Sequence, residues 1–243
     1  MQANYKIILF LAIALALPTS QMTVFAADYT PYNSSTMRTS THTQTKFCPY
    51  NFSVNSDLTN CTTYGLVIHD KSLKGANLSG SIFTSADIYN VNLSHANLQN
   101  ATLRGSVIAS ADLSYADLRG ADLRGINFYH SNLEGADLRG AKITGSIFPS
   151  VNFEDANLQG VVFSQTKSEL ANFLDANLQD VDMSQAELLG ADFTGANLQD
   201  ADLHNSDLAG GSLAQANLSG ANVGGLDTAG ADLSCHGHQI CIG

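Results

Sequence analysis

The sequence repeats every five residues over most of its length. From Ala76 to Cys235 it divides into 32 uninterrupted blocks, of which ANLSG and ADLRG are typical. The third place of the block is apolar in 30 of them, and the first place is Ala in 19. This period suits neither a helix nor a long strand, but the first and third places share one side of an extended backbone. Gly, Ser, Asn and Asp crowd the last two places and favour turns, so each block predicts one short extended side and one corner.

Twenty-residue order lies on top of the five-residue order and predicts four blocks per coil. One column of third-place residues is uniformly Leu, and each of these Leu residues follows an Ala two positions earlier. A second column, from Leu73 to Leu233, includes the consecutive Phe153, Phe173 and Phe193. Coils stacked about 4.8 Å apart would give about eight coils and a rod of roughly 38 Å. The uniform column is the predicted structural core: Leu78, Leu98, Leu118, Leu138, Leu158, Leu178, Leu198 and Leu218.

The A(D/N)LxX blocks resemble the pentapeptide-repeat family. The close match covers residues 76–235, and the repeat region is expected over residues 66–235. The resemblance implies an all-β fold, a right-handed quadrilateral parallel β-helix, with the first and third places inward and the others outward. Stacking such repeats would bury one continuous core, in which each Leu or Phe contributes about 1.5–3 kcal/mol.

One block departs from the pattern. Thr166–Leu170 (TKSEL) places Ser168 where an apolar residue belongs. Either Ser168 points inward with a hydrogen-bond partner, or the backbone bulges and Leu170 packs in its place. We expect the bulge, with an exposed tip at Lys167–Glu169; a binding loop is the functional alternative.

The N-terminal segment has the three-part pattern of a secretory signal. Ile7–Leu17 is an unbroken apolar run, and Val24-Phe25-Ala26 follows it. This predicts a signal peptide over residues 1–26, cut near Ala26, because eleven residues are too few to span a bilayer as a helix. Residues 27–47 are rich in Ser and Thr and are expected to form a flexible lead-in. The mature chain would then be an exported bacterial protein, periplasmic or secreted, without a membrane span.

The four cysteines lie at the two ends of the repeat region, where an open solenoid needs covers. An exported chain with an even count favours disulfides. Of three connectivities we expect Cys48–Cys61 in an N-terminal cap over residues 48–65, and Cys235–Cys241 beside a tail over residues 236–243. Cys235, His236, His238 and Cys241 also present zinc-type ligands, but export argues for oxidised cysteines, and we expect no metal.

Charge is distributed unevenly along the chain. The net charge is −11 and the isoelectric point is about 4.7, which argues against direct binding to nucleic acid. Residues 27–150 contain nine acids and nine bases, whereas residues 151–243 contain thirteen acids and one base, Lys167. The candidate basic patch is Arg104, Arg119, Arg124 and Arg139, near Lys142, and we expect it to pair with neighbouring Asp side chains. The candidate acidic patch, which could attract a cation or a basic partner, is Asp180, Asp182, Asp200 and Asp202.

No catalytic constellation is visible in the sequence. His95, His130 and His204 fall on different columns, and phosphate-loop and nucleophile-elbow motifs are lacking. We therefore expect a non-enzymatic structural or interaction module, without a cofactor, that presents rigid faces to a protein or other macromolecule. Some members of the family imitate duplex DNA, bind DNA gyrase and protect it from quinolones, so a DNA mimic is the first alternative. A metal-binding protein that uses the Cys/His tail is the second.

Overall fold

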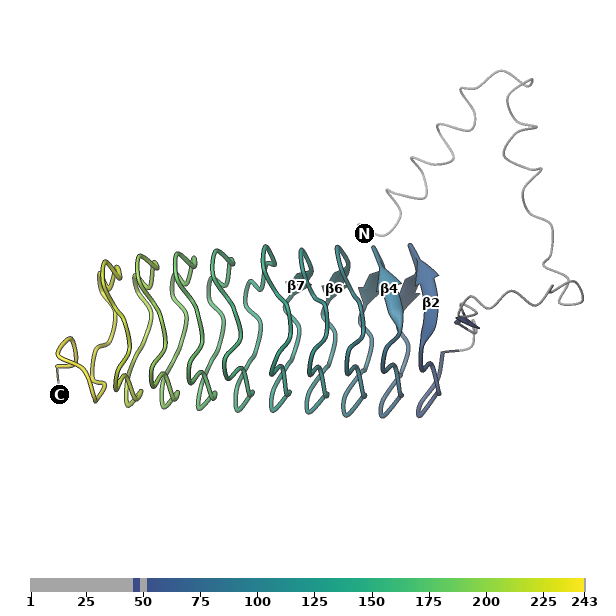
Figure 1. The fold of residues 1–243 in the computed structure, drawn as a ribbon, viewed down its shortest axis with the longest axis horizontal. Coiled ribbons are helices and arrows are strands. Elements are labelled where there is room, and N and C mark those ends of the chain that lie inside the picture. Colours follow the sequence, from purple (N-terminus) through teal and green to yellow (C-terminus); the bar gives the residue numbers. More distant parts are fainter. Residues whose placement is uncertain (1–45, 49–51, 243) are drawn as a thin grey trace, which may run out of the picture. The chain divides into compact units, whose positions relative to one another are not determined.

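The computed structural model describes residues 46–48 and 52–242, which form an all-β parallel solenoid (Figure 1). This confirms the expected fold class. The predicted signal peptide and nearly all of the predicted lead-in lie outside the described residues. Two parallel sheets are formed, in the orders β1-β2-β4 and β3-β5-β6-β7. The strands are β1 (Lys46–Phe47), β2 (Cys61–Tyr64), β3 (Val67–His69), β4 (Ile82–Thr84), β5 (Asp87–Tyr89), β6 (Val107–Ala109) and β7 (Asn127–Tyr129).

The coils stack in a register of twenty residues. Ile68 pairs with Ile88 between β3 and β5, and single bridges continue the same spacing, as from Asp182 to Asp202. The ladder also includes Asp57, which pairs with Asn77, and β2, which pairs with β4. Residues expected to belong to the N-terminal cap therefore take part in the same stack as the repeats.

The corners are tight turns whose third residue has a positive φ. In a typical corner the Ala76 N–H donates to the Leu73 carbonyl at 2.9 Å, and Gly75 between them has φ +67°. This is the geometry of a type II turn, which favours Gly or Asn at that residue. Every fifth place from Asn55 to Gly230 has a positive φ, including bulky residues such as Tyr115 and Leu170. The corner therefore recurs every five residues whether or not a glycine is present.

Asn and Asp at the second place hold these corners closed. The Asn92 Oδ1 accepts the Ser94 N–H at 2.9 Å, and the Asp182 Oδ1 accepts the Ser184 N–H at 2.9 Å. Such an oxygen mimics a backbone acceptor and fixes the turn. The second place is therefore more than a solvent-facing position, because its side chain anchors the backbone.

In one corner a serine at the first place of the next coil supplies the hydrogen bonds that the turn itself lacks. The Ser106 Oγ accepts the Ala86 N–H at 3.0 Å and donates to the Phe83 carbonyl at 2.8 Å. It thereby bridges the corner of the preceding coil, which runs from Phe83 to Ala86. Buried backbone groups need such partners, so this serine completes the hydrogen bonding of the coil before it.

First- and third-place side chains fill the interior as one continuous core. The eight Leu residues of the uniform column are at most 2% exposed. Beside them, Phe153 and Phe173 stack with centroids 5.0 Å apart, and Phe173 and Phe193 at 4.7 Å. Phe148 and Phe163 join the same aromatic group, 5.2 Å apart. Aromatic side chains therefore fill more of the core in this part of the solenoid than elsewhere among the described residues.

The expectation of a bulge at Thr166–Leu170 was wrong. The block keeps the register, because the Ser168 N–H donates to the Glu187 carbonyl at 2.7 Å and Lys167 bridges to Ile147. Ser168 is fully buried, and its hydroxyl has no hydrogen-bond partner among the described residues. Leu170 is 66% exposed. The small serine occupies a core place in the part of the solenoid where the stacked Phe side chains take up the most volume.

Candidate interaction surfaces

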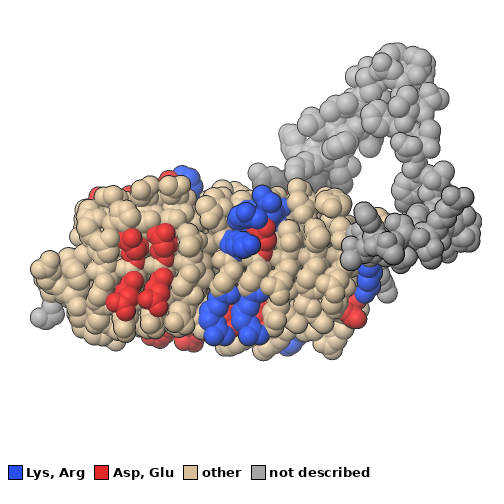
Figure 2. Space-filling model, viewed as in Figure 1, with Lys and Arg blue, Asp and Glu red and all other residues tan. Residues whose placement is uncertain are grey.

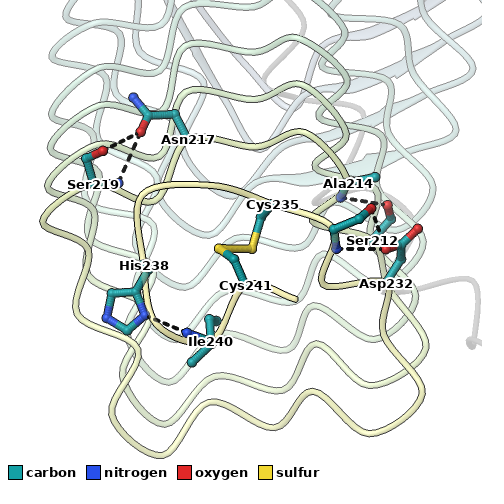
Figure 3. The surroundings of a disulfide bond; sticks show 10 residues. Ser212, Ala214, Asn217, Ser219, Asp232, Cys235, His238, Ile240 and Cys241 are labelled. Carbon is teal, nitrogen blue, oxygen red and sulfur yellow. Dashed lines mark hydrogen bonds between the residues drawn. A yellow bond between two sulfur atoms is a disulfide. The ribbon is translucent and has the colours of Figure 1, made fainter. Parts of the chain in front are cut away.

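Both ends of the solenoid carry a disulfide, as expected. At the first end Cys48 is bonded to Cys61. Strand β1 pairs with β2 at the same end, where Lys46 lies opposite Cys61. At the other end Cys235 is bonded to Cys241 and lies within the outline of the last coil (Figure 3). Cys61 is fully buried and Cys235 is 8% exposed. The bridges therefore lie against the ends of the hydrophobic core.

The C-terminal segment leaves the repeat by shortening its register. Asn217 pairs with His236, nineteen residues ahead rather than twenty. The chain then turns back, so that the Ile242 N–H donates to the Leu233 carbonyl at 2.9 Å. Ile240 and Cys241 pack partly buried against the core. The tail thus lies over an end that would otherwise expose apolar side chains and unpaired strand edges.

These disulfides also bear on the zinc alternative. Both sulfur atoms of the C-terminal segment are bonded to each other, so neither is a thiolate ligand. The His238 Nδ1 accepts the Ile240 N–H at 3.3 Å. Among the described residues no group of three or more His, Cys, Asp or Glu side chains is placed to hold a metal ion.

The four arginines of the basic patch lie beside carboxylates of the second place. Arg119 contacts Asp117 at 2.7 Å, and its Nε lies 3.7 Å from Asp137 of the next coil. The other three contacts join Arg124 to Asp122, Arg139 to Asp137 and Arg104 to Asp122, at 2.5, 2.6 and 3.9 Å. The arginine side chains remain about half exposed.

These contacts determine the titration of the carboxylates. Hydrogen bonds from Arg119, Arg124 and Arg139 hold the pKa values of their aspartates below the usual range. Ionised acids therefore neutralise much of the patch. The aspartates concerned are Asp117, Asp122 and Asp137.

The acidic patch occupies two successive coils of the second half. Asp182 and Asp202 are bridge partners at the second place, and Asp180 and Asp200 occupy the preceding corners with positive φ. The His204 Nδ1 lies 2.8 Å from the Asp202 carboxylate. The one Lys of this half, Lys167, contacts Glu187 at 2.6 Å. Figure 2 shows acidic side chains gathered toward the C-terminal end and basic side chains gathered toward the middle of the same face.

Asparagine ladders run along the second half where aspartate pairs with arginine in the first. The Asn172 Nδ2 donates to the Asn152 Oδ1 at 2.8 Å, and Asn152 donates to Asn132 at 3.0 Å. A second ladder includes Asn177, which donates to Asn157 at 3.2 Å. The block pattern A(D/N)LxX does not distinguish Asn from Asp at this place. The twenty-residue spacing of Asn was the signal that could have revealed the ladders.

A shallow hollow of about 430 Å³ lies near the first end of the solenoid. Its lining includes Asp70, Lys71, Asn90 and Asp112. Hydrogen bonds from Asn90 at 2.7 Å and from His69 at 3.1 Å lower the pKa of the Asp70 carboxyl. An ionised, already bonded carboxylate is a poor general acid. His95 stacks on Tyr115, with the ring centroids 5.4 Å apart.

No helix among the described residues is long and apolar enough to cross a membrane.

Comparison with known proteins identifies the class that this geometry defines. The family model "Pentapeptide repeats" matches residues 72–95, 86–125 and 111–148, and the model "Pentapeptide repeat region" matches residues 144–213. Together they cover more than half of the chain. The protein therefore belongs to the pentapeptide-repeat family.

Solved structures of the same class are similar to the chain, whereas no curated protein matches it in sequence. HetL, a pentapeptide repeat protein involved in heterocyst differentiation regulation in the cyanobacterium Nostoc sp. strain PCC 7120, is 28% identical, with TM-score 0.45, over 76% of this chain and 89% of its own. QnrB1, a plasmid-mediated fluoroquinolone resistance protein, is 21% identical, with TM-score 0.34, over 80% and 91%. A pentapeptide repeat protein of the Arabidopsis thaliana thylakoid lumen is 33% identical, with TM-score 0.19, over 48% and 67%.

Proposed function

We propose that the protein is an exported, non-enzymatic interaction module that holds charged surfaces at fixed spacing for a macromolecular partner. One observation carries this proposal: charged side chains stand in register on a solenoid whose interior is filled. Asp182 and Asp202, for example, are bridge partners in successive coils. A filled interior leaves little concave space for catalysis, while parallel stacking fixes surface charges about 4.8 Å apart.

Disulfides at both ends support the exported location. Cys48–Cys61 and Cys235–Cys241 account for all four cysteines of the chain. Such bonds persist in oxidising compartments and are rare in the cytosol. The apolar run Ile7–Leu17, followed by Ala26, supplies the matching export pattern.

Fractionation of the native cells, with N-terminal sequencing and thiol counting, tests the proposal. We expect a chain that begins near Ala27, lies outside the cytoplasm and has no titratable thiol before reduction and four after it. A cytoplasmic chain that retains Met1 and has four free thiols would overturn export and both disulfides together.

The acidic second half favours one alternative, a mimic of duplex DNA that binds DNA gyrase. Residues 151–243 carry thirteen acids and one base, and at twenty residues per coil they span about 22 Å. This is roughly one net negative charge per 2 Å, close to the value of about 1.7 Å for duplex DNA. Inhibition of gyrase supercoiling by the purified protein, or relief of quinolone inhibition, would support this alternative. Recovery of the protein only outside the cytoplasm would exclude it, because gyrase is cytoplasmic.

A further inference from the structure

One edge of the solenoid carries both charge clusters, separated along its length. We call it the charged edge: the corner at residues 120, 140, 160, 180 and 200, with the fourth place before it and the whole side that follows it, as far as the fourth places of Arg104 and Arg124. Figure 2 shows the two clusters on one face with a band of uncharged residues between them. The basic cluster is Arg104, Arg119, Arg124, Arg139 and Lys142, and the acidic cluster is Asp180, Asp182, Asp200 and Asp202.

The two clusters have matching spacing. Arg119 and Arg139 are one coil apart in one column, and Asp180 and Asp200 are one coil apart in the adjoining column. One coil advances about 4.8 Å along the solenoid. The distance between the two arginines is therefore the same as the distance between the two aspartates further along the edge.

The band between the clusters is uncharged. Its corner residue is Gly160, and no atom lies within 4 Å of the place that a Cβ of Gly160 would occupy. Beside this corner Val162 is 48% exposed at a second place that carries Asp or Lys in the neighbouring coils. A second surface could therefore approach the backbone closely here and cover an apolar side chain.

We infer that two copies of the chain associate antiparallel along the charged edge. A two-fold axis that crosses the edge at the level of Gly160, perpendicular to the solenoid, places the basic cluster of each copy against the acidic cluster of the other. Arg119 then faces Asp200 of the second copy, and Arg139 faces its Asp180. Val162 meets its own equivalent near the axis. Such a two-fold contact is self-complementary and closed, as in most homodimers.

The internal ion pairs leave the arginines able to make these contacts. The side chain of Arg119 is 47% exposed although it contacts Asp117. A guanidinium has five N–H donors, and exposed ion pairs hold their side chains only weakly. The basic cluster also has five cations against the three carboxylates Asp117, Asp122 and Asp137, so it keeps a net positive charge.

Charge also selects this partner and this orientation. A parallel pair would align acidic cluster with acidic cluster, and like charges across an interface cost several kcal/mol. The antiparallel pair instead places Lys142 opposite Asp182 in the column of Val162 and leaves the far acidic ends of the two copies apart. Asp122, which it places opposite Asp202, is already hydrogen-bonded to Arg124. The inference does not depend on export or on the proposed function, because it concerns only two copies of this solenoid.

Charge reversal tests the inference in protein expressed from the full-length sequence and purified as the cell delivers it. We expect a dimer for the natural protein by sedimentation equilibrium. R119E/R139E and D180K/D200K should each weaken its dissociation constant at least about 100-fold. An equimolar mixture of the two variants should dimerise again, because each contact then joins Glu to Lys or Asp to Arg. A natural protein that remains monomeric, a reversal that leaves the dimer intact or a mixture that stays monomeric would each overturn the inference.

A matched control lies on another corner. D155K/D175K makes the same charge change, one coil apart, at corner residues with the same positive φ. A Cβ at Gly195 would meet Asp175, just as one at Gly220 would meet Asp200, so the local surroundings also match. This variant should dimerise as the natural protein does; loss of its dimer to the same extent would overturn the assignment to the charged edge.

A cysteine variant keeps the test decisive if a charge-reversed chain fails to fold. V162C should form a disulfide between two copies on mild oxidation, because Val162 lies near the two-fold axis. V67C, at the 61% exposed Val67 of β3, should not. Equal cross-linking of both variants, or of neither, would count against the antiparallel contact.

Discussion

The two halves of the solenoid share one backbone but are stabilised by different side chains. Up to about residue 150 the outward second place carries Asp beside Arg at three positions. All the strands of the described residues also lie in this half, the last of them ending at Tyr129. Beyond that point single bridges, asparagine ladders and stacked Phe side chains prevail. The corners and the twenty-residue register are common to both, so the repeat specifies the backbone and leaves surface chemistry free to vary.

The largest expected difference between the halves lies in the core. F173A should lower the free energy of unfolding by about 3–5 kcal/mol, because Phe173 stacks between Phe153 and Phe193. L113A, in the same column of the first half, should cost about 2–5 kcal/mol. Urea denaturation of both variants measures the difference. Equal or reversed losses would show that the aromatic stack adds nothing beyond ordinary burial.

The asparagine ladder should be weaker than the core and specific to the amide. N172D keeps the oxygen that accepts the Leu174 N–H, but it loses the Nδ2 donor to Asn152. It should cost about 1–2 kcal/mol at neutral pH, and N172S, which removes the amide donor without adding charge, should cost less. If N172D were as stable as the natural protein, the ladder would be incidental to stability.

The buried Ser168 offers a change in the opposite direction. S168A removes a hydroxyl that has no hydrogen-bond partner in the described part of the chain, and it should raise the free energy of unfolding by about 1 kcal/mol. S206A is the matched change, because the Ser206 Oγ donates to the Met183 carbonyl at 2.7 Å, and it should be destabilising. A loss of stability in S168A similar to that in S206A would indicate a hydrogen bond to Ser168.

The ion pairs should make the smallest contribution to stability of the features compared, and that contribution should be lost in acid. Because arginine hydrogen bonds lower the pKa values of Asp117, Asp122 and Asp137 in the folded state, the unfolded chain takes up protons first. Their contribution is therefore present above about pH 4 and is lost as the pH falls from there through the lowered folded values. Each pair is worth about 0.2–1 kcal/mol.

Replacement of these three aspartates by Asn tests this interpretation, because Asn retains the oxygen that caps the turn. The stability of the triple variant should fall less between pH 5 and pH 3 than that of the natural protein. The corresponding triple Arg→Gln variant should show the same flattening. If the stability of both triple variants fell with pH as that of the natural protein does, the ion pairs would not contribute to stability.

The sequence predicted the backbone better than the surface. The apolar third place and the uniform column from Leu78 to Leu218 indicated the coil and its register, because a narrow interior tolerates few side chains. The end disulfides followed from cysteine positions and the predicted oxidising compartment. Block composition misled at Ser168, where block length proved the stronger determinant: five residues complete one side and one corner whatever fills the core.

Side-chain interactions between coils were less accessible from the sequence. The role of Ser106 depends on a corner twenty residues earlier that lacks its own turn hydrogen bond, and a five-residue pattern does not show which corners lack one. Similarly, Gly135 lies under the Tyr115 ring of the preceding coil, where a Cβ would come within 2.5 Å of two ring atoms. Both require comparison of residues twenty apart, which is the distance at which neighbours in this fold meet.

That distance also constrains how such a gene can change in length. Insertion of twenty residues would add one coil and return every later side chain to its original face. Insertion of five would also preserve the corners, but it would turn all downstream faces by one side and carry Asp180 and Asp200 away from the edge they share with Gly160. Lineages that keep the charged edge should therefore gain or lose sequence between Arg139 and Asp180 in whole coils, whereas lineages without it are free to vary by single blocks.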